Sequence, residues 1–226
     1  MILSIETSTP ACSIALHREG KLLAEQSYYS EKSHSVLLPV IIEELLINTQ
    51  VLRNELLAVS ISAGPGSYTG LRIGISAAKG LCFALQIPLI SVNSLDALIE
   101  QARMWVQDHT LIAPMIDARR MEVYTKLVSS SGEEVWPVKP LIISKHIFQE
   151  FEGKKICVLG SGSEKCKGVL NHSDIQFIPF RHPSAADSGS IAWSKYQNKD
   201  FENLAYFEPN YLKEFQTKKP TNQLLT

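Results

Sequence analysis

The sequence has no surplus of charge and no long apolar run, and each absence excludes a class of protein. Its 22 basic and 23 acidic residues give a net charge of −1, so it lacks the basic surplus of proteins that bind nucleic acid unaided. No apolar run reaches the roughly 18 residues that cross a membrane, and no signal peptide is evident at Met1. We therefore expect a cytoplasmic protein with no membrane partner.

Cysteine and histidine show no spacing that is typical of metal ligands. The four cysteines form no Cys-x-x-Cys pair, and three of them lie in apolar segments, so we expect reduced, structural thiols. A single histidine, such as His34, is more often a capped or solvated residue than a ligand. The four cysteines are Cys12, Cys82, Cys157 and Cys166.

Complete phosphate-binding fingerprints are also missing, although one glycine-rich block resembles them. The apolar run 56–62, typical of a buried strand, precedes this block, and 71–85, typical of a helix, follows it. A strand, a glycine turn and a helix N-terminus together present backbone N–H groups to an anion. However, no P-loop lysine is present, and the Gly-x-Gly-x-x-Gly pattern fails at Thr69. These gaps favour a tight turn over a phosphate site. The block is Gly64-Pro65-Gly66-Ser67-Tyr68-Thr69-Gly70-Leu71-Arg72-Ile73-Gly74.

Small residues recur on one face of the predicted helix 71–85. Each glycine inside a helix costs about 1 kcal/mol relative to alanine, so we expect a steric reason for them. A flat face lets another backbone approach, either the protein's own sheet or a helix of another subunit. The helix by itself favours neither. The flat stripe consists of Gly70, Gly74, Ala77, Ala78 and Leu81.

The segment 34–48 is typical of a helix that is apolar around most of its circumference. A surface helix needs an apolar stripe only about 100° wide, so this helix has a second face to bury. We expect it to form a flat apolar surface with the helix 71–85 and to bind a partner there. Gly74→Arg should then abolish binding and leave the fold intact, whereas packing on the protein's own core predicts unfolding. Besides the stripe, the expected interface residues are Leu37, Ile41, Leu45, Tyr68, Leu71 and Arg72.

The order of predicted strands and helices repeats once along the chain, as two βββαβα units. We therefore predict an α/β protein of two similar lobes, 1–107 and 108–226. A strand at 87–92 and a helix ending near Gln107 join the units, and a helix at 185–198 follows them. The first unit has strands at 1–6, 12–17, 21–28 and 56–62, with helices at 34–48 and 71–85. The second has strands at 111–117, 122–128, 133–138 and 155–159, with a helix at 144–151 and another ending near Leu170. The irregular ending 201–215 is expected to be pinned by Tyr206, Phe207, Tyr211 and Phe215.

Turns in both units hold weak candidates for nucleotide binding. Hydroxyls and backbone N–H groups in the turn after the first strand are able to bind phosphate, although such a turn is more often only a turn. Two lone acids, one in each unit, could hold a metal or water. A glycine pair in the second unit is a candidate site for binding adenosine. These candidates are Glu6, Thr7, Ser8, Thr9, Asp117, Gly160 and Gly162.

These features together resemble the actin, sugar-kinase and chaperone-ATPase (ASKHA) superfamily. Within it, the chain resembles the bacterial TsaB family, also called YeaZ, over nearly its full length. The block from Gly64 and the segment Asp117-Ala118-Arg119-Arg120 are its most specific parts. The other matching segments are Ile5-Glu6-Thr7-Ser8, His34-Ser35, Leu38-Pro39, Glu122-Val123-Tyr124 and Pro209-Asn210-Tyr211-Leu212.

The resemblance implies a role in making threonylcarbamoyladenosine beside the anticodon of tRNA. In this family the paralogue TsaD carries the catalytic site, the TsaB-like subunit binds it through the two helices of the first lobe, and the ATPase TsaE joins them. The resemblance therefore implies a TsaD-like partner, a TsaE-like ATPase and contact with tRNA only through the complex. An apolar helix surface would also allow a homodimer of the isolated chain.

The resemblance also implies what this chain lacks. TsaD-like chains bind a metal with a His-x-x-x-His pair on the helix after the fifth strand, and the matching positions here are Ser94 and Leu98. Leucine cannot ligate a metal, and serine is a poor ligand for transition metals. We therefore expect no catalytic residue, metal or cofactor in this chain, with ATP and a metal ion in the partner subunits. A self-standing ATP-binding phosphotransferase of the same fold is the alternative, and a metalloprotease is less favoured because the histidine pair is missing.

Overall fold

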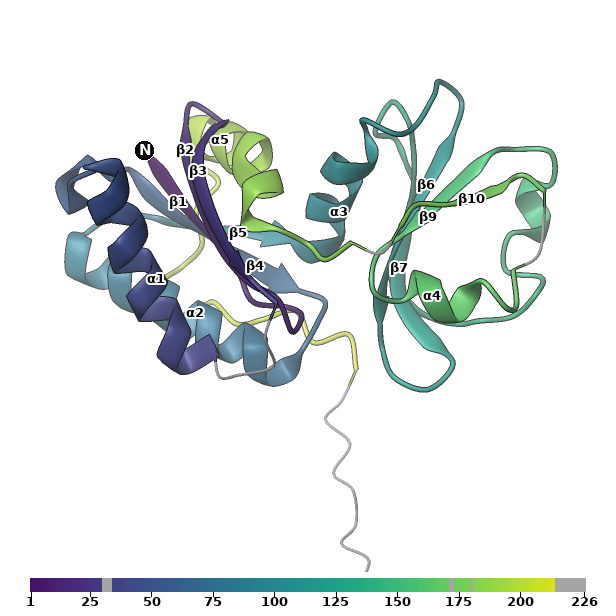
Figure 1. The fold of residues 1–226 in the computed structure, drawn as a ribbon, viewed down its shortest axis with the longest axis horizontal. Helices are drawn as coiled ribbons and strands as arrows, with labels where there is room; N and C mark the ends of the chain where they lie inside the picture. Colours follow the sequence, from purple (N-terminus) through teal and green to yellow (C-terminus); the bar gives the residue numbers. More distant parts are fainter. Residues whose placement is uncertain (30–33, 171–172, 180, 214–226) are drawn as a thin grey trace, which may run out of the picture.

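The fold consists of two lobes joined by a helix, with a long C-terminal segment that returns to the first lobe (Figure 1). The structure is a computed structural model that describes residues 1–29, 34–170, 173–179 and 181–213. In this described part of the chain, no helix is long and apolar enough to cross a membrane.

The first lobe is built on a five-stranded sheet with the strand order β3-β2-β1-β4-β5. The central strand β1 is antiparallel to β2 and parallel to β4, so a hairpin and a parallel crossover share one strand. Every residue of β1 is buried, which shows that both faces of this sheet are covered. The strands are β1 (Ile2–Glu6), β2 (Cys12–Arg18), β3 (Lys21–Tyr28), β4 (Ala58–Gly64) and β5 (Leu89–Asn93).

The second lobe repeats the same arrangement with the order β8-β7-β6-β9-β10. Its central strand β6 is antiparallel to β7 and parallel to β9, as β1 is to β2 and β4. This repetition confirms the predicted two-lobed α/β fold of the ASKHA type. The strands are β6 (Leu111–Asp117), β7 (Glu122–Ser129), β8 (Glu134–Ile142), β9 (Ile156–Leu159) and β10 (Ile175–Phe177).

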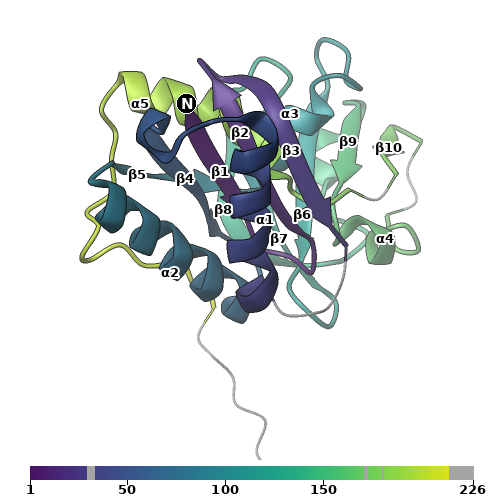
Figure 2. The ribbon, with the colours of Figure 1, turned by 60° about the vertical axis from the view of Figure 1, so that its left-hand side comes forward.

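Helices cover the two lobes unequally. In the first lobe, α1 (His34–Thr49) and α2 (Tyr68–Leu85) lie side by side on one face of the sheet (Figure 2). Helix α2 begins three residues before the predicted start, because the Ser67 side chain accepts a hydrogen bond from the Gly70 N–H and caps it. Helix α3 (Ser94–Ala102) lies between the lobes, where its apolar side chains pack on the second sheet.

Several predicted helices are shorter in the structure. The predicted helix 144–151 is only the 3₁₀ turn η2 (Gln149–Phe151), and the helix expected to end near Leu170 is only α4 (Ser163–Cys166). Another 3₁₀ turn, η1 (Arg53–Glu55), precedes β4. The second lobe thus keeps the sheet of the repeat and reduces its helical cover.

The C-terminal segment corrects the expectation that 108–226 forms one lobe. The turn η3 (Ala185–Ser188) and helix α5 (Gly189–Gln197) pack on the first sheet, on the face opposite α1 and α2 (Figure 1). Ala192 of α5 belongs to an apolar cluster with Ile2 and Ile90. Because the first sheet is apolar on both faces, its second face needs this cover.

The small-residue stripe of α2 faces the protein's own first turn, which corrects the predicted interface. On α2, four of the expected interface residues are buried: Gly70, Leu71, Gly74 and Ala78. A Cβ added to Gly70 would lie 2.1 Å from the Thr7 carbonyl oxygen, and one added to Gly74 would lie 2.2 Å from Thr7 Oγ1. Gly74→Arg is therefore expected to disrupt the core, and not to leave the fold intact.

The expected stripe of α1 also points inward. Ile41 and Leu45 are buried in the main core cluster of the first lobe, and Leu37 packs against it half-buried. Side chains that face the sheet repeat every three or four residues, and these residues share that face. The inward-facing residues Leu37, Ile41 and Leu45 are therefore not free to contact a partner, which corrects the expected interface on α1.

Two glycines of α2 provide a matched test of this packing. We expect Gly74→Ala to destabilise the fold by about 1–3 kcal/mol, because the new Cβ displaces the buried Thr7 hydroxyl from its bond to Gly70 O. Gly80→Ala, with nothing within 4 Å of its Cβ, should stabilise the fold by about 0.5–1 kcal/mol. Chemical denaturation of both variants measures the difference. Equal effects would show that Gly74 is not packed against the first turn.

Candidate functional site

The β1–β2 turn, the first candidate for phosphate binding, is closed by the protein's own chain. The Ser67 N–H donates to the Ser8 carbonyl oxygen (2.6 Å), and the Thr7 hydroxyl donates to Gly70 O (2.8 Å). A Cβ on Gly66 would lie 2.2 Å from Ser8 O, so the two backbones touch directly. The predicted residues Glu6, Thr7, Ser8 and Thr9 do come together here, but all four are buried.

Glu6 is tied into this turn and is poorly suited to hold a cation. Its Oε1 accepts a hydrogen bond from the Ser8 N–H (2.6 Å), which uses a backbone donor that a phosphate would need. Burial raises the pKa of Glu6, although hydrogen bonds from Ser8 act against the shift. On the outer side of the turn, His34 Nε2 lies 2.9 Å from Thr9 O and caps the backbone.

Asp117, the acid of the second lobe, is already neutralised by a lysine. Asp117 Oδ1 accepts hydrogen bonds from Lys165 Nζ (2.5 Å) and from the Arg119 N–H (2.7 Å). Lys165 also donates to Arg120 O, so the lysine holds the β6–β7 turn together. The Asp117 carboxylate is exposed, and its ion pair with Lys165 helps to fix the conformation of this turn.

The glycine pair of the second lobe is used for packing and forms no adenosine site. Gly160 has a φ of +100°, and a Cβ there would lie 2.4 Å from Met115 O. A Cβ on Gly162 would lie 2.6 Å from Val123 Cγ1. Both glycines therefore let the β9–α4 turn approach β6 and β7 closely. The structure does not support their expected role in nucleotide binding.

The positions that match the metal-binding histidines of TsaD-like chains are both buried. Ser94 Oγ lies 2.6 Å from Ser62 Oγ, and Leu98 belongs to an apolar cluster with Leu95 and Ile99. Within the described residues, no group of three or more His, Cys, Asp or Glu could hold a metal ion. The surroundings of Leu98 are apolar and do not fit a transition metal.

Sequence reasoning missed how residues 202–213, here called the C-terminal strap, cross the first lobe. The Asn210 N–H donates to Ala63 O (2.9 Å), and Lys79 Nζ donates to Phe207 O (2.9 Å). Of the aromatic residues expected to pin this ending, Phe207 packs on the core, whereas Tyr206 is 83% exposed. Phe215 lies outside the described residues. The sequence signals of the strap are these aromatic residues and the segment Pro209-Asn210-Tyr211-Leu212, and neither predicts where it crosses the first lobe.

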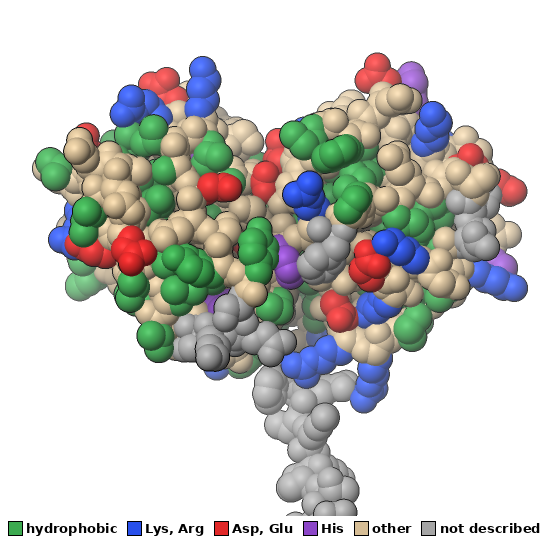
Figure 3. All heavy atoms as spheres, in the orientation of Figure 1, with side chains coloured by type: hydrophobic (Ala, Val, Ile, Leu, Met, Phe, Trp, Pro, Cys, Tyr) green, Lys and Arg blue, Asp and Glu red, His purple; other side chains and the backbone are tan. Residues whose placement is uncertain are grey.

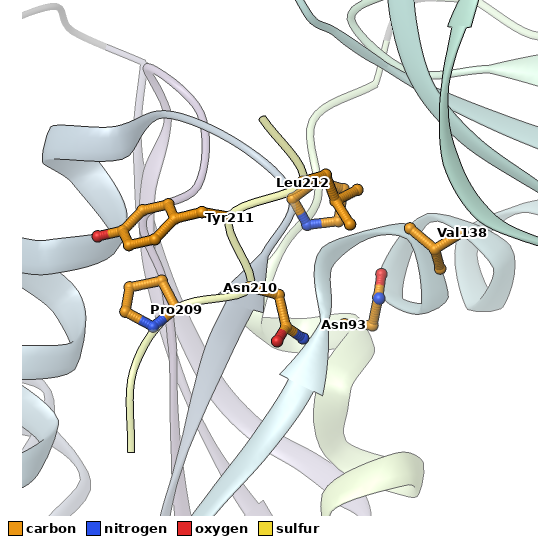
Figure 4. A pocket seen from close by; sticks show the side chains of 7 residues that line it. Asn93, Val138, Pro209, Asn210, Tyr211 and Leu212 are labelled. Carbon is orange, nitrogen blue, oxygen red and sulfur yellow. The ribbon is translucent and has the colours of Figure 1, made fainter. Parts of the chain in front are cut away.

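A pocket of about 310 Å³ lies between the strap and the two lobes (Figure 4). Asn93 comes from the end of β5 and Val138 from β8, so both lobes contribute to it. Its lining has no Asp, Glu, His, Cys, Ser or Lys side chain, so the Tyr211 phenol is the only titratable side chain among the residues that line it. The lining residues are Pro65, Asn93, Val138, Pro209, Asn210, Tyr211 and Leu212.

The outward faces of α1 and α2 carry exposed apolar side chains, and hydrophobic side chains gather over this part of the molecule (Figure 3). The most exposed are Val36 and Phe83, each 71% exposed. Of the expected interface residues, Arg72 is exposed, and Tyr68, Ala77 and Leu81 are half-buried. The patch, here called the two-helix outer face, consists of Val36, Val40, Ile47, Ile73 and Phe83.

Comparisons with known proteins agree with this fold. The model of the family described as "TsaD: tRNA N6-adenosine threonylcarbamoyltransferase" matches residues 22–219. The TsaB protein of Bacillus subtilis is 41% identical over 126 residues, which cover 56% of this chain and 54% of that protein. The TsaB protein of Buchnera aphidicola from Acyrthosiphon pisum is 33% identical over 217 residues, covering 94% of this chain and 97% of the relative. Both are described as tRNA threonylcarbamoyladenosine biosynthesis proteins.

A solved structure supports the same relationship. YeaZ of Pseudomonas aeruginosa matches with a TM-score of 0.81 and 26% identity, and the match covers 93% of this chain and 99% of that one. Fold, family model and relatives thus agree with the resemblance carried by the block from Gly64 and by Asp117-Ala118-Arg119-Arg120. The chain belongs to the TsaD-related family described by that model and, within it, to the TsaB (YeaZ) family.

Proposed function

We propose that the chain is a non-catalytic subunit of a complex that makes threonylcarbamoyladenosine in tRNA, and that it binds a TsaD-like catalytic subunit. The names of its TsaB relatives support the pathway. The observation that carries the non-catalytic role is the closed β1–β2 turn, where the Ser67 N–H donates to Ser8 O and the Thr7 hydroxyl donates to Gly70 O. A phosphate would have to displace a buried part of the protein's own core.

The two-helix outer face is the proposed contact with the TsaD-like subunit. Val36, Val40 and Ile47 lie on one side of α1 by their spacing. Glu43 lies on the same side, and its charge is paired with Arg53. Phe83 extends the exposed apolar surface onto α2. Exposed apolar patches of this kind mark protein contacts in soluble proteins. The proposal keeps the two helices expected from the sequence and uses their outward faces.

The other subunits would supply what this chain lacks. We propose that ATP and a metal ion are bound by the TsaD-like subunit and a TsaE-like ATPase, and that tRNA meets this chain only within the complex. Without a partner, the two-helix outer face would pair with a second copy of the chain, because removing the same apolar surface from water is favourable.

The alternative of a self-standing phosphotransferase finds little support in the geometry. ATP-dependent transfer needs a phosphate cradle and carboxylates that hold Mg²⁺. Here Glu6 is buried in a closed turn, and Asp117 is paired with Lys165. The adenosine candidate, formed by Gly160 and Gly162, is filled by neighbouring strands.

Val40→Lys is expected to abolish binding to the TsaD-like subunit. The side chain is 50% exposed in the free chain, so the lysine is tolerated there, but an unpaired charge buried at a contact costs several kcal/mol. Affinity should fall by about a hundredfold or more. Isothermal calorimetry with the purified partner measures the loss, and thermal melting of the variant shows whether the monomer remains folded.

Ile142→Lys is the matched control, because Ile142 is an apolar residue of the second lobe that is 68% exposed. The same charge is added there, away from the two-helix outer face, and binding should be unchanged. If Val40→Lys binds like the wild-type chain, or if Ile142→Lys loses binding instead, the proposed contact is wrong.

The isolated chain is expected to bind Mg·ATP weakly, with a dissociation constant above about 1 mM. The physical reason is that the backbone N–H groups of Ser8 and Ser67 already donate to Glu6 Oε1 and to Ser8 O. Calorimetric titration of the purified chain measures this directly. A dissociation constant in the low micromolar range would instead support the phosphotransferase.

A further inference from the structure

A band of cations and tyrosines lies beside the pocket between the strap and the two lobes, which Tyr211 helps to line. On the first lobe, the Arg72 guanidinium lies 4.2 Å from the ring centre of Tyr68, which stacks on Tyr211 of the strap at 4.8 Å. Arg72 Nε also donates to the Tyr211 hydroxyl (3.0 Å). The members of this band, here called the basic–aromatic strip, are Arg72, Tyr68, Tyr211, Lys213, Tyr124 and Arg119.

The strap carries the strip across to the second lobe. Two residues after Tyr211, Lys213 Nζ lies 5.6 Å from the ring centre of Tyr124 and pairs with Glu122. Burial raises the pKa of the Tyr124 phenol, and the positive charge of Arg119 acts in the opposite direction. The strip thus runs from α2 along the strap to Tyr124 of β7, and Arg119 belongs to the β6–β7 turn that precedes this strand.

The arginines at the far end of the strip are exposed, and their side chains form no ion pair within the described residues. Lys165 fixes the backbone beneath them through Asp117 and Arg120 O, and this frees the guanidinium groups for other partners. Both residues have positive φ, 66° for Arg119 and 49° for Arg120, so the turn holds them in place.

Acidic residues are present near the strip, but Lys and Arg residues outnumber them there. Asp117 and Glu122 are paired with Lys165 and Lys213, and Glu208 lies near Arg72. Arg119 and Arg120 therefore remain as unpaired positive charge in a chain whose net charge is −1. A partner that meets the strip must be an anion, and the partly exposed rings of Tyr211 and Tyr124 favour one that also carries aromatic rings.

We propose that the basic–aromatic strip contacts the backbone and unpaired bases of the tRNA when the chain is part of the complex. RNA offers phosphates for arginine and bases that stack on aromatic or guanidinium planes. The strip begins at Arg72, next to Ile73 of the two-helix outer face, so RNA held by a partner docked there can extend along it. This inference rests on the proposed function, because the strip has too little surplus charge to bind RNA by itself.

The test uses the complex of this chain with its TsaD-like subunit and measures tRNA affinity between 50 and 200 mM KCl. For the double variant Arg119→Gln with Arg120→Gln, the slope of log affinity against log salt should become shallower by about 1.5, because each phosphate contact contributes about 0.7–0.9. Affinity at 0.1 M salt should fall by about 10- to 30-fold. Arg119→Lys with Arg120→Lys keeps the charges and should keep the slope.

The matched control is Arg18→Gln with Lys21→Gln. It removes the same amount of charge from the β2–β3 hairpin, which contributes no residue to the strip. Its salt slope should equal that of the wild-type complex. If both double variants behave alike, the strip does not contact tRNA. If an added TsaE-like ATPase binds the wild-type complex but not the arginine variant, and the tRNA slope is unchanged, the strip is a protein contact and the proposal is wrong.

Co-purification separates this result from a failure of the proposed function. The wild-type chain and the arginine variant must both retain the TsaD-like subunit, because Arg119 and Arg120 lie outside the two-helix outer face. If the wild-type complex does not form, the proposed function fails, and the tRNA contact fails with it. If the complex forms and the slopes are equal, only the tRNA contact fails.

Discussion

The contact between the β1–β2 turn and the start of α2 is the constraint on which the rest of the structure depends. The Thr7 hydroxyl donates to Gly70 O and the Ser67 N–H donates to Ser8 O, and Thr7, Ser8 and Gly70 are buried. Only glycine allows such an approach, since a Cβ at Gly66, Gly70 or Gly74 would lie about 2 Å from this turn. Breaking these bonds would leave buried polar groups unsatisfied, at about 1–3 kcal/mol each.

This contact determines which side of each helix remains free. With Gly74 turned toward Thr7, the opposite side of α2 presents Phe83, and α1 packs beside it with Val36 and Val40 outward. The same contact fills the position at which a phosphate would meet the first turn. One packing interaction therefore accounts both for the expected lack of nucleotide binding and for the apolar surface that we propose binds a partner.

Much of the fold could be predicted from the sequence because its signals are local. Apolar runs marked β1 and β4, and the repeated order of strands and helices predicted the two similar sheets. The orientation of α2 could not be predicted in this way. Small residues at Gly70 and Gly74 indicate that a backbone lies close, but whether it belongs to the same chain depends on Thr7, more than sixty residues earlier in the sequence.

The return of the C-terminal segment was missed for a similar reason. A fully apolar β1 indicates that both faces of its sheet are covered, yet nothing local assigns α5 to that task. For the candidate site, the residues of the first turn lie together in the structure, but their burial was not foreseen. The cations of the strip come from three distant segments, around Arg72, Arg119 and Lys213, which only the folded chain brings together.

Hydrogen exchange of the chain, alone and in complex with its TsaD-like subunit, tests the central claim most directly. The account predicts slower amide exchange in 34–49 and 68–85 on complex formation, because the outward faces of α1 and α2 become covered. Exchange in β8, residues 134–142, should not change. Protection confined to the second lobe, with α1 and α2 unaffected, would contradict the account.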